Sequence, residues 1–147
     1  MPGVAAYGAD EARAWAEQAA EAGAQCVMLL PPNAYRADER AVMEHYRIVN
    51  KAGIPIVAYN NPYDTKVDLT PSLLGKLHAE GLIVAVKEFS GDARRAYEIA
   101  EFAPELDILI GSDADCTLCA CLSMYVCLCT SMHVVRLFAC VTCQHVP

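Results

Sequence analysis

Cysteine is scarce in the first 115 of the 147 residues, where Cys26 stands alone. A disulfide framework needs paired cysteines, so none is expected there, and a reducing compartment such as the cytoplasm is favoured. The other seven of the eight cysteines lie between Cys116 and Cys143. The average cysteine content therefore describes mainly the end of the chain.

Acidic residues and glycine are missing from the end of the chain, where Arg136 is the one strongly basic residue after position 115. All 18 acidic residues and ten of the 11 basic residues lie in 1–115, which leaves that part with a formal charge of −8. This change predicts a partial enzyme domain over 1–114 and an atypical Cys-rich tail over 115–147. For the tail we favour an out-of-frame sequence or an unrelated join.

Three other absences narrow the possible functions. The chain has a net charge of −7 and lacks the surplus of Lys and Arg with which nonspecific nucleic-acid binders neutralise phosphates. No basic segment precedes a long apolar run near the N-terminus, so no signal peptide is predicted. Residues 1–115 hold no apolar run of membrane-spanning length, and Ser, Thr and His interrupt 116–135. We expect neither a nucleic-acid partner nor a membrane partner.

Two hydrophobic periodicities alternate along 1–115. Continuous apolar runs predict buried parallel strands at 4–7, 26–30, 54–59, 82–87 and 106–110. Patterns with helical spacing predict helices at 10–22, 38–51, 72–79 and 92–102. Thr70 as an N-cap and Pro71 at the first helical position mark the start of the third helix.

Strict alternation of strands and helices predicts an α/β fold with a parallel sheet and right-handed crossovers. Two architectures compete, a doubly wound sheet and part of a (β/α)₈ barrel. No glycine-rich phosphate fingerprint follows the first strand, which weakens the dinucleotide-binding version. Polar side chains instead follow several strands, where a barrel enzyme keeps its site. We therefore predict an incomplete barrel of about five βα units.

Two reactive side chains end neighbouring predicted strands. Lys87 closes the run 82–87, and a buried ammonium is costly, so its neutral and nucleophilic amine is favoured there. Tyr59 closes the run 54–59 in the same way, and a phenol beside an amine can relay protons. A solvent-facing lysine and a packed tyrosine are the structural alternatives. Together the two residues predict a catalytic pair.

Five segments carry a family resemblance. They are 27–32 (VMLLPP), 59–62 (YNNP), 67–71 (VDLTP), 86–92 (VKEFSGD) and 110–113 (IGSD). In order and spacing they resemble the dihydrodipicolinate synthase/N-acetylneuraminate lyase family, whose members are (β/α)₈ barrels of the class I aldolase type. The resemblance implies a cofactor-independent Schiff base between a lysine and pyruvate or another 2-keto acid.

The same resemblance assigns roles to individual residues. Lys87 would form the Schiff base, Tyr59 would relay protons, and Tyr35, Asn61 and Gly111 would contact the substrate. Family members act on small molecules, and full-length members are commonly homotetramers, so a small-molecule substrate and a homo-oligomer are implied.

Departures from the family keep several functions open. The first two barrel units and their carboxylate-binding segment are missing, and 63–65 (YDT) stands where synthases place an arginine. Aldol-type bond formation or cleavage, as in a 4-hydroxy-tetrahydrodipicolinate synthase, is the first prediction. A keto-acid dehydratase or deaminase and an inactive truncated remnant are the alternatives.

Two C-x₂-C pairs in the tail, Cys116 with Cys119 and Cys140 with Cys143, have the spacing of a structural zinc site. Three further thiols fit no single four-ligand site, and no glycine supports a knuckle turn after either pair. We therefore predict no metal and keep zinc as the weaker alternative.

Overall fold

The computed structural model of the chain describes residues 1–92 and 94–111, and the backbone of two later strands. The elements in chain order are β1 (Gly3–Val4), α1 (Ala9–Glu21), β2 (Val27–Leu29), α2 (Glu39–Asn50), β3 (Ile56–Asn60), α3 (Pro62–Thr65), α4 (Pro71–Ala79), β4 (Ala85–Glu88), α5 (Arg95–Phe102), β5 (Asp107–Ile110), β6 (Tyr125–Cys129) and β7 (Met132–Arg136).

The five predicted strands and four predicted helices are all present, with shifted ends. The first strand is shorter than predicted, with only two residues, and the last of the four helices begins at Arg95 rather than at position 92. Thr70 caps α4 as predicted, because its side chain accepts a hydrogen bond from the Leu73 N–H. The short helix α3 was not predicted. It begins with Pro62 after the capping side chain of Asn61.

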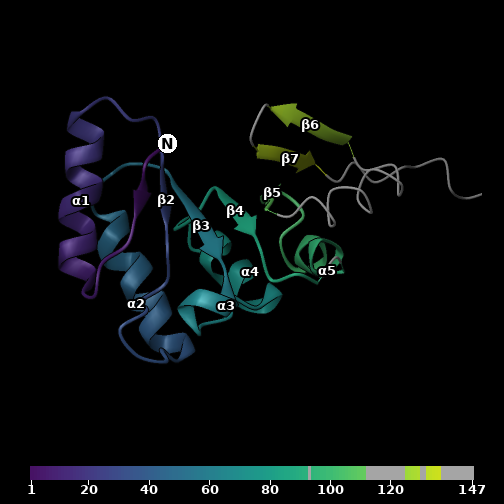
Figure 1. Cartoon of the computed structure of the whole chain (residues 1–147), viewed down its shortest axis with the longest axis horizontal. Helices are drawn as coiled ribbons and strands as arrows, with labels where there is room; N and C mark the ends of the chain where they lie inside the picture. The colour runs from purple at the N-terminus through teal and green to yellow at the C-terminus, as the bar shows by residue number, and fades with distance from the viewer. Residues whose placement is uncertain (93, 112–124, 130–131, 137–147) are drawn as a thin grey trace, which may run out of the picture.

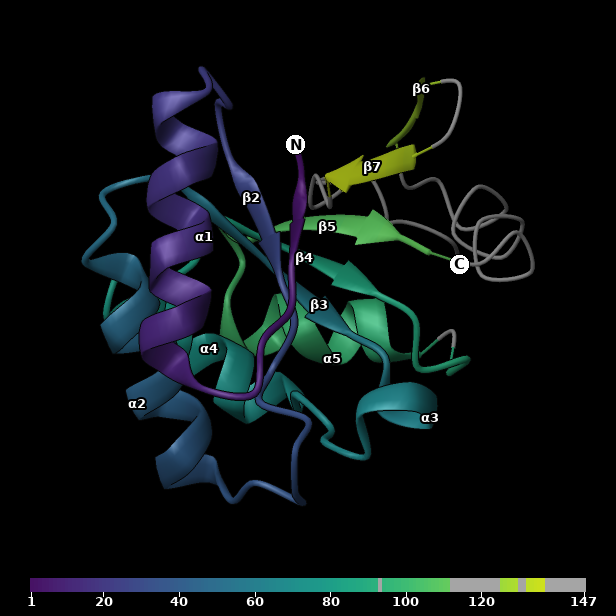
Figure 2. The same ribbon diagram turned by 60° about the vertical axis from the view of Figure 1, so that its left-hand side comes forward.

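The first five strands pair in parallel and in chain order, β1-β2-β3-β4-β5. Right-handed crossovers between strands added in one direction place every connecting helix on the same face of the sheet. Figures 1 and 2 show α1, α2, α4 and α5 along one side of the curved sheet. This arrangement is that of a barrel segment, because a doubly wound sheet reverses its strand order and carries helices on both faces.

The two faces of the sheet differ in how they are packed. On the helix side, the main core includes Ile56, Ala58, Val86 and Ile108, which alternate along adjacent strands. A smaller cluster of Val57, Ala85 and Leu109, with Cys26 against it, lies on the other face. This second face corresponds to the inside of a barrel.

The strands described after β5 do not continue the parallel pairing in sequence order. The next strand in the sheet is β7, which pairs antiparallel with β5, and β6 pairs antiparallel with β7. The cysteines of the two C-x₂-C pairs lie outside the described residues. The boundary near residue 114 and the zinc alternative therefore stay predictions.

A buried polar network joins β3 to β4 on the helix side. The Asn60 side-chain amide donates to the Glu88 carboxylate at 2.9 Å, and its oxygen accepts from the Leu69 N–H at 2.9 Å. Glu88 is only 3% exposed and also accepts a hydrogen bond from the Ser90 N–H. These partners satisfy side chains that would otherwise be costly to bury.

A salt bridge extends this network toward α5. Asp68 accepts from the Asn60 amide at 3.2 Å and from two nitrogens of Arg95 at 3.0 and 3.1 Å. The Arg95 side chain is largely buried, and its two parallel hydrogen bonds fix the geometry of the pair. The segment that returns from α3 is thus tied both to the sheet and to α5.

We expect Gly111→Ala to destabilise the fold by about 1–3 kcal/mol, the usual cost of overpacking. A Cβ at this position would lie 2.8 Å from Phe89 Cδ2 and 2.9 Å from the Glu88 carbonyl oxygen. Urea unfolding followed by circular dichroism measures the effect. The control is Gly3→Ala, because Gly3 is exposed in β1 and the nearest atom to an added Cβ there is Met28 Cε, at the ordinary contact distance of 3.9 Å. Equal stabilities of the two variants would contradict the packing argument.

A second prediction concerns Glu88, whose pKa is raised by burial against the opposing effect of its hydrogen bonds from Asn60 and Ser90. Because the pKa of Glu88 is higher in the folded state than in the unfolded state, its protonated form favours folding. This contribution to stability is fully present below the unfolded-state pKa, near 4.5, and is lost as pH rises through the folded-state pKa. Glutamine cannot titrate, so we expect the free energy of unfolding of Glu88→Gln to increase relative to that of the wild type as pH rises above about 4.5. Urea unfolding across this range measures the difference.

The matched variant Asp92→Asn should behave in the opposite way. Hydrogen bonds from Arg94 hold the pKa of Asp92 at about 2, below its usual value of 3.8. The contribution of Asp92 is present above the unfolded value and is lost as pH falls through the folded value. The difference in the free energy of unfolding between Asp92→Asn and the wild type should therefore change only below about pH 4. A pH-independent difference for Glu88→Gln would refute the burial argument.

Candidate functional site

Tyr59 and Lys87 lie directly opposite one another in the parallel ladder of β3 and β4. Both are half-buried, and the Lys87 Nζ lies 4.6 Å from the centroid of the Tyr59 ring. The face of an aromatic ring attracts an ammonium group at this distance. The structure therefore brings together the two side chains that the sequence predicted as a pair.

The pair lies on the sheet face that carries no helices in the described part of the chain. Side chains alternate along a strand, so Tyr59 and Lys87 share the face of Val57 and Ala85. Glu88 follows Lys87 directly but turns into the helix side, where Asn60 binds it. The neighbouring carboxylate is therefore held away from the amine by the pleat of β4.

Asn61 lies next to the tyrosine at the start of α3. Its side chain is 5% exposed and donates to the Tyr59 hydroxyl at 3.3 Å and to the Asp64 carboxylate at 2.6 Å. Its oxygen accepts from the Asp64 N–H at 3.4 Å, which caps α3. The structure places this predicted substrate-binding residue beside Tyr59, and its contact with a substrate stays a prediction.

Gly111 follows β5 at the same edge of the sheet. Its N–H donates to the Glu88 carbonyl at 2.9 Å, which extends the pairing of β4 with β5 by one residue. The close approach of Phe89 gives this glycine a packing role. The predicted substrate contact of Gly111 stays a prediction beside that role.

Tyr35 lies in the loop after β2 and is 62% exposed. It lines a hollow of about 410 Å³ with Arg36 of the same loop and with Arg40 and Glu44 of α2. Neither Tyr59 nor Lys87 lines this hollow. This hollow is thus separate from the Tyr59 and Lys87 pair, and the substrate contact of Tyr35 stays a prediction.

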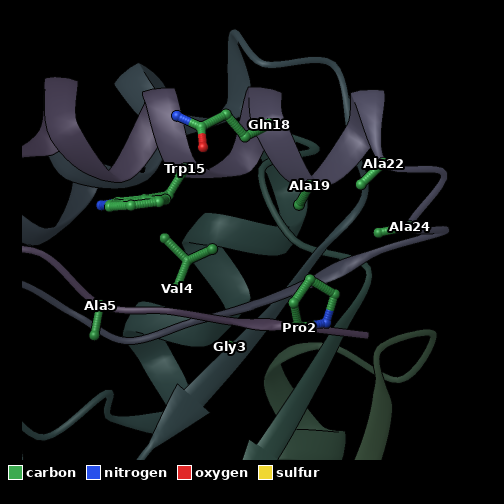
Figure 3. A pocket seen from close by; sticks show the side chains of 9 residues that line it. All are labelled: Pro2, Gly3, Val4, Ala5, Trp15, Gln18, Ala19, Ala22 and Ala24. Atoms are coloured by element: carbon green, nitrogen blue, oxygen red, sulfur yellow. The ribbon is translucent and has the colours of Figure 1, made fainter.

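Another hollow, of about 430 Å³, lies between β1 and α1 and is mostly apolar. Figure 3 shows Trp15 and Ala19 of α1 above Val4 and Pro2. Trp15 is 51% exposed, and within the described residues β1 pairs only with β2, so this side of the sheet is open. The hollow is separate from the Tyr59 and Lys87 pair, because neither residue lines it.

Sequence reasoning missed the role of Asn60 and the direction of Glu88. The sequence signal for both was the pair Asn60 and Asn61 at the end of a strand, since successive side chains there point to opposite faces of the sheet.

Within residues 1–92 and 94–111, no three His, Cys, Asp or Glu side chains gather in a way that could hold a metal. None of the helices described there is long and apolar enough to cross a membrane.

Comparison with known proteins gives consistent matches. The model of the dihydrodipicolinate synthetase family matches residues 1–127. The 4-hydroxy-tetrahydrodipicolinate synthase of Methanothrix thermoacetophila is 36% identical over 123 residues, which cover 80% of this chain and 42% of that protein. The chain thus spans about two fifths of the length of this curated relative.

Solved structures show the same partial coverage. The dihydrodipicolinate synthase from Agrobacterium tumefaciens str. C58 superposes with a TM-score of 0.74 at 27% identity, over 82% of this chain and 44% of that one. A prophage protein of the dihydrodipicolinic acid synthase family from E. coli K12, solved in complex with pyruvate, has the same fold. Its TM-score is 0.69 at 23% identity, over 76% of this chain and 39% of that one.

These matches confirm the predicted fold class, an incomplete α/β barrel. The family model extends over most of the sequence, including every described residue of the Tyr59 and Lys87 face. The chain belongs to the dihydrodipicolinate synthetase family.

Proposed function

We propose that this chain carries the Schiff-base part of a lyase or synthase site for pyruvate or another 2-keto acid. The observation that carries the proposal is the register of β3 and β4, which sets Lys87 opposite Tyr59 with the amine 4.6 Å from the ring centroid. Both lie at the carboxyl end of parallel strands, where barrel enzymes assemble their sites. The family and the pyruvate complex of a fold neighbour support the choice of substrate.

The chemistry requires one nucleophile and one proton carrier. The Lys87 amine forms a bond to the keto carbon, and the carbonyl π pair moves to the oxygen, which takes the Tyr59 proton. The new ammonium nitrogen of this carbinolamine returns a proton to the Tyr59 oxygen. The hydroxyl then leaves as water with the Tyr59 proton, and the nitrogen lone pair closes a protonated imine.

The protonated imine then acts as an electron sink. The Tyr59 phenolate takes a proton from the carbon next to the imine, and the carbon–hydrogen bond pair forms an enamine. The enamine carbon can attack an electrophile to form a carbon–carbon bond, and cleavage follows the reverse path. This sequence is the aldol-type reaction proposed for the chain, in the manner of a 4-hydroxy-tetrahydrodipicolinate synthase.

The segment after β3 bears on the second substrate. Residues 63–65 are Tyr63, Asp64 and Thr65, and Asp64 is turned to the Asn61 amide. No guanidinium from this segment can hold the carboxylate of a second substrate. A keto-acid dehydratase or deaminase of the same family, which needs no such second acid, is therefore the second candidate.

We further propose a cytoplasmic enzyme that acts on small molecules and, like full-length members of the family, assembles as a homo-oligomer. The chain spans about two fifths of its curated relatives, and the described sheet has five parallel strands rather than eight. An inactive remnant is the alternative that fits these two facts. Trapping of the imine separates the two.

We expect pyruvate and borohydride to add a stable mass to Lys87, because borohydride reduces the imine to a secondary amine. Intact-mass analysis and peptide mapping locate the adduct. Lys87→Ala should abolish it, whereas Lys76→Ala should leave it unchanged, since Lys76 lies on α4 and pairs with Glu39 at the surface. If protein that shows a cooperative unfolding transition forms no adduct, the proposal is wrong.

We also expect Tyr59→Phe to slow imine trapping by about 100-fold, in the range typical of a lost general acid–base group. The ring that Lys87 contacts is kept in this variant, so only the hydroxyl is removed. Stopped-time borohydride quenching measures the rate. An unchanged rate would assign the proton transfers to another group.

A further inference from the structure

The side chain of Asn61 is fixed in one orientation by its own partners. The Asp64 carboxylate only accepts hydrogen bonds, so the atom 2.6 Å from it is the amide nitrogen of Asn61 and not the oxygen. The oxygen faces the Asp64 N–H, which donates to it. The nitrogen is therefore also the atom that lies 3.3 Å from the Tyr59 hydroxyl, and it donates there.

The backbone on both sides of Asn61 is held as firmly. The Asn61 carbonyl accepts from the Thr65 hydroxyl at 2.9 Å and from the Thr65 N–H at 3.0 Å. The preceding residue, Asn60, is fully buried and bound to Glu88 and Leu69. A buried side chain with this support cannot swing away from the tyrosine without breaking the start of α3.

An amide nitrogen carries two hydrogens, and both are used here. One goes to Asp64 and the other to Tyr59, while the amide oxygen takes the Asp64 N–H. No donor of Asn61 is left for a keto acid. The role that the family resemblance implied, direct contact with the substrate, therefore fits these partners less well than a role through Tyr59.

We propose that Asn61 is a positioning residue for Tyr59, a role that rests on the proposed Schiff-base function. By donating to the phenol oxygen, the Asn61 amide occupies one acceptor position and directs the hydroxyl proton away from itself, toward the reacting keto acid. When Tyr59 gives up that proton, the same N–H stabilises the phenolate, because hydrogen bonds to a charged oxygen are shorter and stronger. No bond of Asn61 breaks in either step.

The kinetic test uses Asn61→Ser in the full chain. A serine still caps α3, but its hydroxyl is too short to replace the amide at Tyr59. We expect the maximal rate of borohydride trapping to fall about tenfold with the half-saturating pyruvate concentration unchanged, as for a lost hydrogen bond to a charged group. As a control for lost helix stability, Thr70→Ala removes the cap of α4 and should keep the wild-type rate of trapping.

A double-mutant cycle shows whether Asn61 acts through Tyr59. In the Tyr59→Phe background, Asn61→Ser should cause no further loss of rate, since the hydroxyl it serves is gone. The same tenfold loss in both backgrounds would overturn the proposal. A raised half-saturating concentration with an unchanged maximal rate would also overturn it, in favour of direct substrate contact.

A spectroscopic test needs no turnover and separates this proposal from the proposed function. In a proton–nitrogen correlation spectrum, the side-chain amide signal of Asn61, assigned by its loss in Asn61→Ser, should shift in Tyr59→Phe. A shift in protein that forms no imine would refute the Schiff-base function and keep the pairing of Asn61 with Tyr59. An Asn61 signal that stays in place would overturn the positioning role, whatever the activity.

Discussion

The parallel pairing of β3 with β4 is the interaction on which the site depends. In this register Tyr59 faces Lys87 and, one residue later, Asn60 faces Glu88. Because successive side chains point to opposite faces, the first pair meets on the face that carries no helices in the described part of the chain, and the second is buried under the helices. A single ladder therefore builds both the reactive pair and the polar network that anchors the strand ends.

The two pairs also make this register hard to change. A slip of one residue in β4 would turn Lys87 into the helix side of the sheet and Glu88 out of it. Glu88 would then lose its bond to Asn60, and the core of Ile56, Ala58 and Val86 would receive an unpaired ammonium. The buried carboxylate has a cost, but it opposes the alternative pairing that would destroy the site.

Much of this arrangement could be predicted from the sequence. The continuous apolar runs located the five strands, and the polar residues at their ends identified Tyr59 and Lys87. Local patterns carry this information, because helical and strand periodicities and capping residues act within a few positions. Helix α3 was missed although Asn61 and Pro62 form the same local start signal as Thr70 and Pro71. With only four residues, α3 has no helical periodicity to support that signal.

By itself the sequence determined the fold class, the partial extent of the barrel and the two reactive side chains, since each rests on periodicity or on a short motif. Only the tertiary structure decided which polar groups meet across the strands. It turned Glu88 away from Lys87, bound Asn60 to Asp68 and Asp68 to Arg95, and set the Asn61 amide on the Tyr59 oxygen. The contacts of Asn60 with Glu88 and of Asp68 with Arg95 depend on the register of the sheet and on the packing of α5, and neither is encoded in any one segment.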